Sequence, residues 1–181
     1  SYPTPFKNNK YITFGSFNSF NKINLNVVEV WSKILKNVKN SKLILKSSKT
    51  LNIDRLKELF KKNGVLESVS FFERNHSFEE HLDLYQNIDI ALDTFPYNGV
   101  TTSFEAIWMN VPVLTMKGFN FNSRCGESIN KNIGINYLIA RDEREYIDKA
   151  IELSKDVEKL TSIRNKIFNE LTSSSLFDKD K

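Results

Sequence analysis

The sequence predicts an α/β fold built on a doubly wound, mainly parallel sheet of six strands and closed by C-terminal helices. Short apolar runs alternate with longer amphipathic stretches along the 181 residues, which is the pattern of strands that are each followed by a helix. The apolar runs are rich in valine, isoleucine and leucine, as expected for parallel strands that are covered on both faces. A chain of this length can bury a full core, so one domain accounts for it.

The first two strands and the helix between them follow directly from this pattern. Residues 11–17, "YITFGSF", form a short apolar run, and residues 42–46, "KLILK", form the next. Between them, residues 24–38 repeat apolar side chains at the spacing of one helical face, with Asn24 or Asn26 available as the N-cap. The expected stripe consists of Val27, Val30, Trp31, Ile34, Leu35 and Val38.

The middle of the chain repeats the alternation. A helix is expected over 54–64, where it stops at a glycine that suits a left-handed C-cap. A strand is expected over 69–73. The next helix, over 77–87, begins with Ser77 and has Glu80 three residues later, which is the pattern of a capping box.

The last third of the chain completes the sheet. The expected strands here are 88–93, 111–116 and 137–140, and the expected helices are 101–110, 123–134, 142–154 and 156–173. Trp31 and Trp108 both fall on apolar helical stripes, so both are predicted to lie in the core. Asp93 ends the fourth strand, where we interpret it as a structural residue that holds the loop after it. Arg124 either anchors its own loop or reaches the cleft.

The fold class predicts where a ligand binds. In the usual order 3-2-1-4-5-6, the first and fourth strands lie side by side where the winding reverses, and ligands bind at their carboxyl ends. The loop after the first strand, "FGSFNSFNK", carries Asn18, Ser19 and Lys22. The loop after the fourth strand, "TFPYNGVTT", carries an asparagine–glycine pair and two threonines. We therefore expect these two polar loops to face each other.

The start of the helix at residue 101 has two open interpretations. A helix N-terminus presents N–H groups without helical partners and a partial positive charge, so phosphate is a natural ligand. Gly99 would let the backbone approach such a ligand, and Thr101 and Thr102 would add hydroxyl donors. Alternatively, Thr102 and Glu105 form a capping box that needs no ligand. Neither loop matches the GxxxxGK[ST] or GxGxxG pattern, so nucleoside triphosphate hydrolysis and NAD binding are not favoured.

Composition narrows the function classes. The 26 basic and 22 acidic residues leave a net charge of +4 without a clustered basic face, so a nucleic-acid module ranks last. No apolar run has the roughly 20 residues that a membrane helix needs, and the first residues lack the apolar core of a signal peptide. His76, His81 and Cys125 make no zinc pattern. The lone cysteine is consistent with a reducing compartment, so we expect a cytoplasmic protein with no membrane partner.

Two motifs carry a resemblance to a known family. "FGSFN…K" and "LDTFPYNGVTT…E…W…VPV" occur in this order and at this separation. Together with the final "SSSLFD", they closely resemble the C-terminal lobe of the O-GlcNAc transferase and SPINDLY family of protein glycosyltransferases. The resemblance covers nearly the whole chain.

The resemblance implies a GT-B fold, in which two Rossmann-like lobes hold a nucleotide sugar between them. Residues 11–172 would then be the nucleotide-sugar-binding lobe, residues 1–10 an N-terminal extension or inter-lobe connection, and residues 173–181 a C-terminal tail. Lys22 would be catalytic, because it would contact the diphosphate and stabilise charge on the departing nucleotide. The implied nucleotide-sugar-binding residues are Asn18, Ser19, His76, Phe78, His81, Asn98, Gly99, Val100, Thr101, Thr102 and Glu105.

The implied roles differ along this set. Thr101 and Thr102 would hold the phosphates, His81 would lie by the base and ribose, and Glu105 would bind the ribose. The backbone near His76 would help to read the base. The resemblance implies neither a cofactor nor a metal, because a lysine and aligned N–H groups can stabilise the leaving diphosphate.

Four positions depart from the family pattern. Members that use UDP-GlcNAc commonly carry glutamine at Ser19, lysine at Phe78, histidine at Val100 and aspartate at Glu105. SPINDLY-type members use GDP-fucose. We therefore expect a UDP-sugar donor, with UDP-GlcNAc favoured, and keep a GDP-sugar open.

The family's N-terminal catalytic lobe and tetratricopeptide repeats have no counterpart in these residues. The acceptor protein or peptide would bind through those regions, so we expect a fragment of a longer enzyme that is inactive alone. The alternative is a non-catalytic scaffold or binding domain that keeps the fold but has a degraded nucleotide site.

Overall fold

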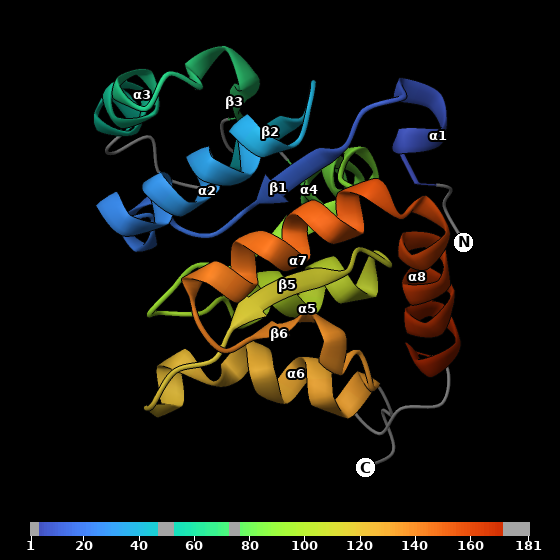
Figure 1. The fold of residues 1–181 in the computed structure, drawn as a ribbon. Helices are drawn as coiled ribbons and strands as arrows, with labels where there is room; N and C mark the ends of the chain where they lie inside the picture. The colour runs from blue at the N-terminus through green and yellow to red at the C-terminus, as the bar shows by residue number, and fades with distance from the viewer. Residues whose placement is uncertain (1–3, 47–52, 73–76, 172–181) are drawn as a thin grey trace.

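The computed structural model describes residues 4–46, 53–72 and 77–171. Its six strands form one parallel sheet in the order β3-β2-β1-β4-β5-β6, which confirms the doubly wound topology (Figure 1). The strands are β1 (Thr13–Ser16), β2 (Lys42–Lys46), β3 (Val69–Phe72), β4 (Ile90–Leu92), β5 (Val113–Met116) and β6 (Ile139–Ala140). The winding reverses between β1 and β4, as the sequence predicted.

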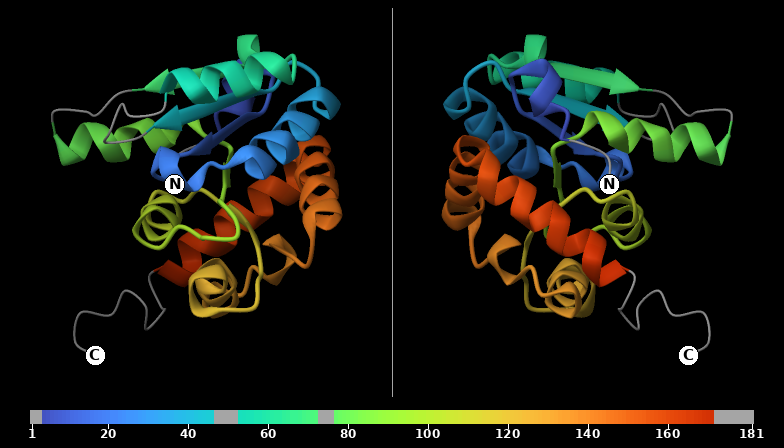
Figure 2. Two further views of the ribbon diagram at one scale, coloured as in Figure 1. Left: turned by 90° about the vertical axis from the view of Figure 1, so that its left-hand side faces the viewer. Right: turned by 90° about the vertical axis from the view of Figure 1, so that its right-hand side faces the viewer.

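Helices cover both faces of this sheet. Helices α2 and α7 lie on one face, and α4 and α5 lie on the other (Figures 1 and 2). The α-helices are α1 (Phe6–Asn9), α2 (Leu25–Asn37), α3 (Ile53–Lys62), α4 (Phe78–Asp83), α5 (Thr101–Trp108), α6 (Cys125–Ile133), α7 (Glu143–Lys155) and α8 (Val157–Leu171). The 3-10 turns are η1 (Phe20–Lys22), η2 (Leu66–Ser68), η3 (Leu84–Asn87), η4 (Phe121–Ser123) and η5 (Asn136–Leu138).

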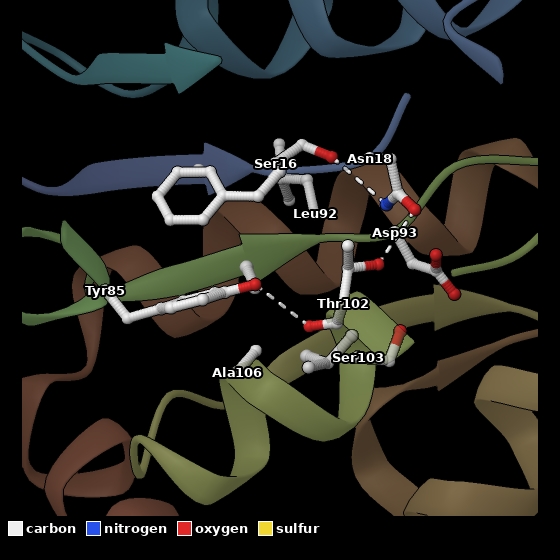
Figure 3. Close-up of a pocket in the computed structure, with 12 residues that line it drawn as sticks. Ser16, Asn18, Tyr85, Leu92, Asp93, Thr102, Ser103 and Ala106 are labelled. Carbon is white, nitrogen blue, oxygen red and sulfur yellow. Dashed lines mark hydrogen bonds between the residues drawn. The ribbon is translucent and has the colours of Figure 1, made fainter. Parts of the chain in front are cut away.

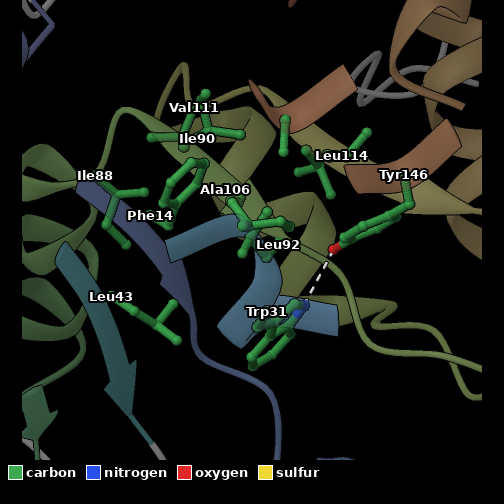
Figure 4. Close-up of a cluster of buried hydrophobic side chains, with 14 of the residues drawn as sticks. Phe14, Trp31, Leu43, Ile88, Ile90, Leu92, Ala106, Val111, Leu114 and Tyr146 are labelled. Carbon is green, nitrogen blue, oxygen red and sulfur yellow. Dashed lines mark hydrogen bonds between the residues drawn. The ribbon is translucent and has the colours of Figure 1, made fainter. Parts of the chain in front are cut away.

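One part of the core lies between α2, the sheet and α7. All six residues of the expected α2 stripe are buried, so the helical period predicted this packing face. Trp31 is fully buried, and its Nε1 donates to the Tyr146 hydroxyl of α7 over 3.4 Å (Figure 4). Because a buried indole N–H requires an acceptor, this bond satisfies the polar atom and fixes α2 against α7.

Local signals placed several helix ends correctly. Asn24 caps α2, since its side chain accepts from the Val27 N–H over 2.9 Å. Ser77 and Glu80 form the expected capping box at α4. Gly64 and Gly134 both have positive φ, 72° and 74°, as glycines after a helix often do.

The expected element lengths needed correction. Most strands are shorter than their apolar runs, and the run at 88–93 contains a strand of only three residues. The helix expected over 77–87 ends at Asp83 and continues as a 3-10 turn. The helix expected over 123–134 begins at Cys125, after a 3-10 turn. The apolar runs are longer than the strands because the residues at their ends are buried by packing but do not pair with a neighbouring strand.

Trp108 does not lie in the core, so that prediction was wrong. The residue is 55% exposed at the end of α5, whereas Ala106 and Ile107 of the same helix are buried. The helix is apolar on more than one side, and periodicity alone did not show which side faces the sheet.

The segment before β1 packs on the lobe. The backbone N–H of Phe6 donates to Asp89 Oδ1 over 3.0 Å, and the N–H of Thr13 donates to Asp89 Oδ2 over 2.9 Å. Asp89 is fully buried, and burial raises the pKa of its carboxyl group. One buried carboxylate thus joins α1 to the start of β1.

Within the described ranges, none of the helices has the length and apolar character to cross a membrane.

Candidate functional site

The loops after β1 and β4 meet at the point where the sheet reverses. The amine of Lys22, in the 3-10 turn η1, donates to the backbone carbonyl of Asn98 over 2.8 Å. The Thr102 hydroxyl of α5 donates to Asn18 Oδ1 over 2.9 Å. These two bonds join segments 76 and 84 residues apart in the chain. The two loops that the sequence placed at this edge therefore meet, and the Lys22 amine contacts the segment that leads into α5.

A buried carboxylate organises the second loop. Asp93 Oδ1 accepts from the N–H groups of Thr94 and Gly99, and Oδ2 accepts from the Thr115 hydroxyl. Burial raises the pKa of Asp93 to about 7, although these hydrogen bonds and the charge of Lys22 oppose the rise. Asp93 thus folds the 93–99 loop onto the sheet, which confirms its interpretation as a structural residue.

The backbone approaches closely at Gly99. A Cβ atom there would lie 2.5 Å from Thr102 Oγ1 and 2.8 Å from Asn18 Oδ1. Both are shorter than any ordinary carbon–oxygen contact, so glycine is required for the Asn18–Thr102 bond to form beside this turn. Next to it, a cavity of about 10 Å³ lies between the ends of β1 and β4 and the first turn of α5 (Figure 3). Such a volume holds about one water molecule.

The start of α5 is not closed by a capping box. Val100 is the N-cap and makes no side-chain cap bond, and Thr102 lies inside the helix with its hydroxyl committed to Asn18. The expected Thr102–Glu105 capping box is therefore wrong, because a partner from the β1 loop took the hydroxyl. Thr101 and Val100 are exposed. The first N–H groups of an α-helix such as α5 have no partner inside the helix.

A chain of polar side chains runs from β2 through α4 to α5. The amine of Lys46 lies 2.5 Å from His81 Nδ1, and His81 Nε2 lies 2.9 Å from Glu105 Oε2. The hydroxyl of Tyr85 lies 3.2 Å from the same carboxylate oxygen and 3.1 Å from the Thr102 carbonyl. Burial is the largest cause that raises the pKa of Tyr85, and Glu105 adds to it. The histidine and the acid expected at a nucleoside site are thus in direct contact.

The other predicted residues lie around these two clusters. Ser19 is exposed at the start of η1, and Phe78 is 65% exposed with its ring 6.1 Å from that of His81. Asn98 is buried, and its side-chain amide donates to the Thr94 carbonyl, so it shapes the loop. His76 lies outside the described residues.

An apolar groove opens beside the histidine, between α4 and α5. Its volume is about 500 Å³. The residues that line it are Phe78, Leu82, Thr101, Phe104, Glu105 and Trp108.

Sequence reasoning did not single out Lys46 or Tyr85. Lys46 is the last residue of β2, at the same edge of the sheet as the two loops. A lysine at the end of an apolar strand was the one sequence feature that could have indicated it.

Arg124, for which two roles were open, pairs with Glu127 three residues later. In the described part of the chain, no three histidine, cysteine or acidic side chains gather in a geometry that could hold a metal ion.

Known proteins match both the sequence and the fold. The family described as glycosyl transferase family 41 matches residues 5–181. A probable UDP-N-acetylglucosamine–peptide N-acetylglucosaminyltransferase SPINDLY of Eustoma exaltatum subsp. russellianum is 36% identical over 99% of this chain, which covers 20% of that protein. A UDP-N-acetylglucosamine–peptide N-acetylglucosaminyltransferase of Caenorhabditis elegans is 32% identical over 92% of the chain, which covers 14% of it. The chain spans about a fifth of the length of the curated SPINDLY relatives it matches.

Solved structures agree with this assignment. An O-GlcNAc transferase mutant of Thermobaculum terrenum superposes with a TM-score of 0.86 and 34% identity, over 90% of this chain and 32% of that one. The C-terminal domain of a group 1 glycosyl transferase of Francisella tularensis shares the fold alone, with a TM-score of 0.70 at 16% identity, over 93% of this chain and 90% of that domain. The chain therefore has the fold of a Rossmann-like lobe of the GT-B type. This chain belongs to glycosyl transferase family 41, as its two loop motifs indicated.

Proposed function

We propose that this chain is the nucleotide-sugar-binding lobe of a protein O-glycosyltransferase and binds the donor diphosphate between Lys22 and the start of α5. The observation that carries the proposal is the convergence of the Lys22 amine with the loop that leads into α5. The ammonium and the first helical N–H groups would both face the diphosphate oxygens, and the Thr101 hydroxyl would add a donor.

This arrangement suits the chemistry of glycosyl transfer. The bond between the anomeric carbon and the diphosphate oxygen breaks, and the bonding electrons leave with the nucleoside diphosphate. Negative charge therefore grows on the leaving group in the transition state. A positioned ammonium and aligned N–H groups stabilise this charge as it develops, without the need for a metal ion. Lys22 is the catalytic residue in this proposal.

The nucleoside would lie on the other side of the same crevice. His81 and Glu105 would contact the base and ribose, and the exposed ring of Phe78 would border the base. The names of the relatives favour a UDP-sugar, with UDP-GlcNAc first, over a GDP-sugar. The acceptor protein would bind through parts of the relatives that this chain does not cover.

Calorimetric titration of the chain with UDP and with GDP tests the proposal. Saturable binding of one nucleotide is expected, with a dissociation constant between about 1 μM and about 1 mM, the usual range for enzyme substrates. The tighter nucleotide identifies the base. If neither binds at millimolar concentration, the proposed site is wrong.

The chain alone is expected to transfer no sugar, because a lobe that spans about a fifth of the curated relatives lacks the rest of the cleft. The measurement is a radiolabelled transfer assay with UDP-GlcNAc or a GDP-sugar and a serine- and threonine-rich peptide. A control enzyme of full length should label the peptide under the same conditions. Transfer by this chain above the background without enzyme would contradict the expectation.

One observation favours a second candidate function, a non-catalytic binding domain. The Lys22 amine and the Thr102 hydroxyl already have protein partners, so the site is satisfied without a ligand. In that case UDP and GDP would not raise the melting temperature of the chain, and Lys22 would be dispensable for any partner binding.

A further inference from the structure

Lys46 is a buried lysine at the edge of the proposed nucleoside site. The residue is only 4% exposed, although lysine is among the residues least often buried. Its amine contacts His81 Nδ1 and lies 5.8 Å from the centre of the Phe17 ring. Burial lowers the pKa of Lys46, and the carboxylates of Glu105 and Glu80 oppose this effect. A buried ammonium requires a partner, and here the partner is the imidazole.

Donor and acceptor roles along the chain follow from this contact. A lysine ammonium has three donors and no acceptor, so His81 Nδ1 must accept its hydrogen bond. The remaining ring proton is then on Nε2, which donates to the carboxylate of Glu105 over 2.9 Å. Each group in the chain thus has one consistent role, and the imidazole is neutral.

We propose that Lys46 is a positioning residue that holds His81 as the neutral Nε2–H tautomer. The consequence for nucleotide binding rests on the proposed function. A neutral imidazole ring of fixed orientation, hydrogen-bonded to Glu105, would then face the nucleoside. A second proton on Nδ1 would put two cations 2.5 Å apart, which like-charge repulsion opposes. Nucleotide affinity would therefore not follow a histidine titration near neutral pH.

The groups around Lys46 support this assignment of protons. Glu80 and His81 face it from α4, Glu105 faces it from α5, and the Phe17 ring faces it from the loop after β1. The Tyr85 hydroxyl of η3 contacts Glu105. The competing arrangement, a neutral lysine beside a doubly protonated histidine, has the same total charge. It would require Lys46 to give its proton to a group that is about four pKa units less basic in water.

Nitrogen-15 NMR of the imidazole rings in the whole 181-residue chain tests the proposal. The chain has two histidines, His76 and His81, and a His76→Gln variant assigns their signals. Between about pH 6 and about pH 8, wild-type His81 is expected to carry a proton on Nε2 only. A proton on Nδ1 in the wild type would overturn the proposal without the need for any variant.

Lys46→Met is the decisive variant, because methionine fills a similar volume without charge. A proton on His81 Nδ1 is then expected to appear over the same pH range, because the ammonium that faces this nitrogen in the wild type is gone. Lys42→Met is the matched control, at the exposed start of the same strand, and should leave the His81 signals unchanged. An unchanged His81 in Lys46→Met would refute the positioning role.

Nucleotide titrations at several pH values test the consequence separately. Asp93 and the terminal phosphate of the nucleotide titrate in the same range in all three chains, so the affinities are compared as ratios to the wild type. The ratio for Lys42→Met should be constant within about twofold from about pH 6 to about pH 8, whereas that for Lys46→Met should change at least about threefold. Affinity profiles that run parallel in all three chains would refute the link from Lys46 to nucleotide binding. If no nucleotide binds to the wild type, the proposed function fails, and the NMR result still decides the role of Lys46.

Discussion

Replacement of Lys22 by methionine is expected to weaken the binding of the preferred nucleoside diphosphate by about 10-fold to about 100-fold. The substitution removes one hydrogen bond to a charged group, worth about 1.5–3 kcal/mol, and each 1.4 kcal/mol is about tenfold in affinity. The helical N–H groups of α5 remain, so binding should weaken and not vanish. Calorimetry at constant ionic strength measures the change.

The control must separate binding from loop structure, because Lys22 also donates to the Asn98 carbonyl. Lys166 makes a similar bond, 2.6 Å from its amine to the carbonyl of Gly134, on α8. Lys166→Met should bind the nucleotide as the wild type does. Lys22→Arg should retain part of the affinity, since it keeps the charge. Equal affinity of Lys22→Met and the wild type would remove the cation from the proposed site.

The sheet order could be predicted because each strand and helix carries its own local pattern. The buried stripe of α2 has a clear helical period, and the apolar strands alternate with such helices, which permits few topologies other than a doubly wound sheet. That order alone brought Lys22 and α5 to one edge. Caps such as Asn24 and Ser77 were also predictable, because a cap depends on residues three positions apart.

What could not be predicted depends on partners far away in the chain. The Thr102 hydroxyl had a local partner in the capping-box pattern, but Asn18 bonds to it from 84 residues away. Lys46 reads as an exposed strand end until His81 is known to lie against it. Trp108 sits on a helix whose apolar residues do not define one face. Each case required knowledge of which surfaces meet, and periodicity carries no such information.

The candidate site also has features that the sequence predicted and features that only the structure showed. Fold class and strand order predicted that the two loops meet at one edge of the sheet, and the loop composition suggested an anion as the ligand. The roles proposed for individual residues at a nucleoside, including those of His81 and Glu105, came from the family resemblance. Their contact with each other was visible only in the structure.

The second large effect concerns Asp93, which holds the 93–99 loop. Its pKa is raised to about 7 in the folded protein from an ordinary value of 3.8, mainly by burial. Between these values the native state holds a proton that the unfolded state has lost. The free energy of unfolding should therefore fall as pH rises from about 4 to about 7, by up to about 1.4 kcal/mol per pH unit from this group.

Asp93→Asn is expected to remove that slope, because asparagine does not titrate. The variant should also be less stable than the wild type at about pH 4, by about 1–3 kcal/mol, since the NH₂ group that replaces one carboxyl oxygen cannot accept the hydrogen bond that this oxygen receives from Gly99 or from Thr115. The difference in the free energy of unfolding between the wild type and Asp93→Asn should become smaller as pH rises. Only the wild type carries a carboxyl group at this position, so only the wild type loses stability when that group is deprotonated. Asp89 is also buried with a raised pKa, but it is present in both proteins and cancels in the difference. Urea denaturation at intervals of one pH unit measures both curves, and parallel curves would show that the Asp93 carboxyl titrates alike in the folded and unfolded chain.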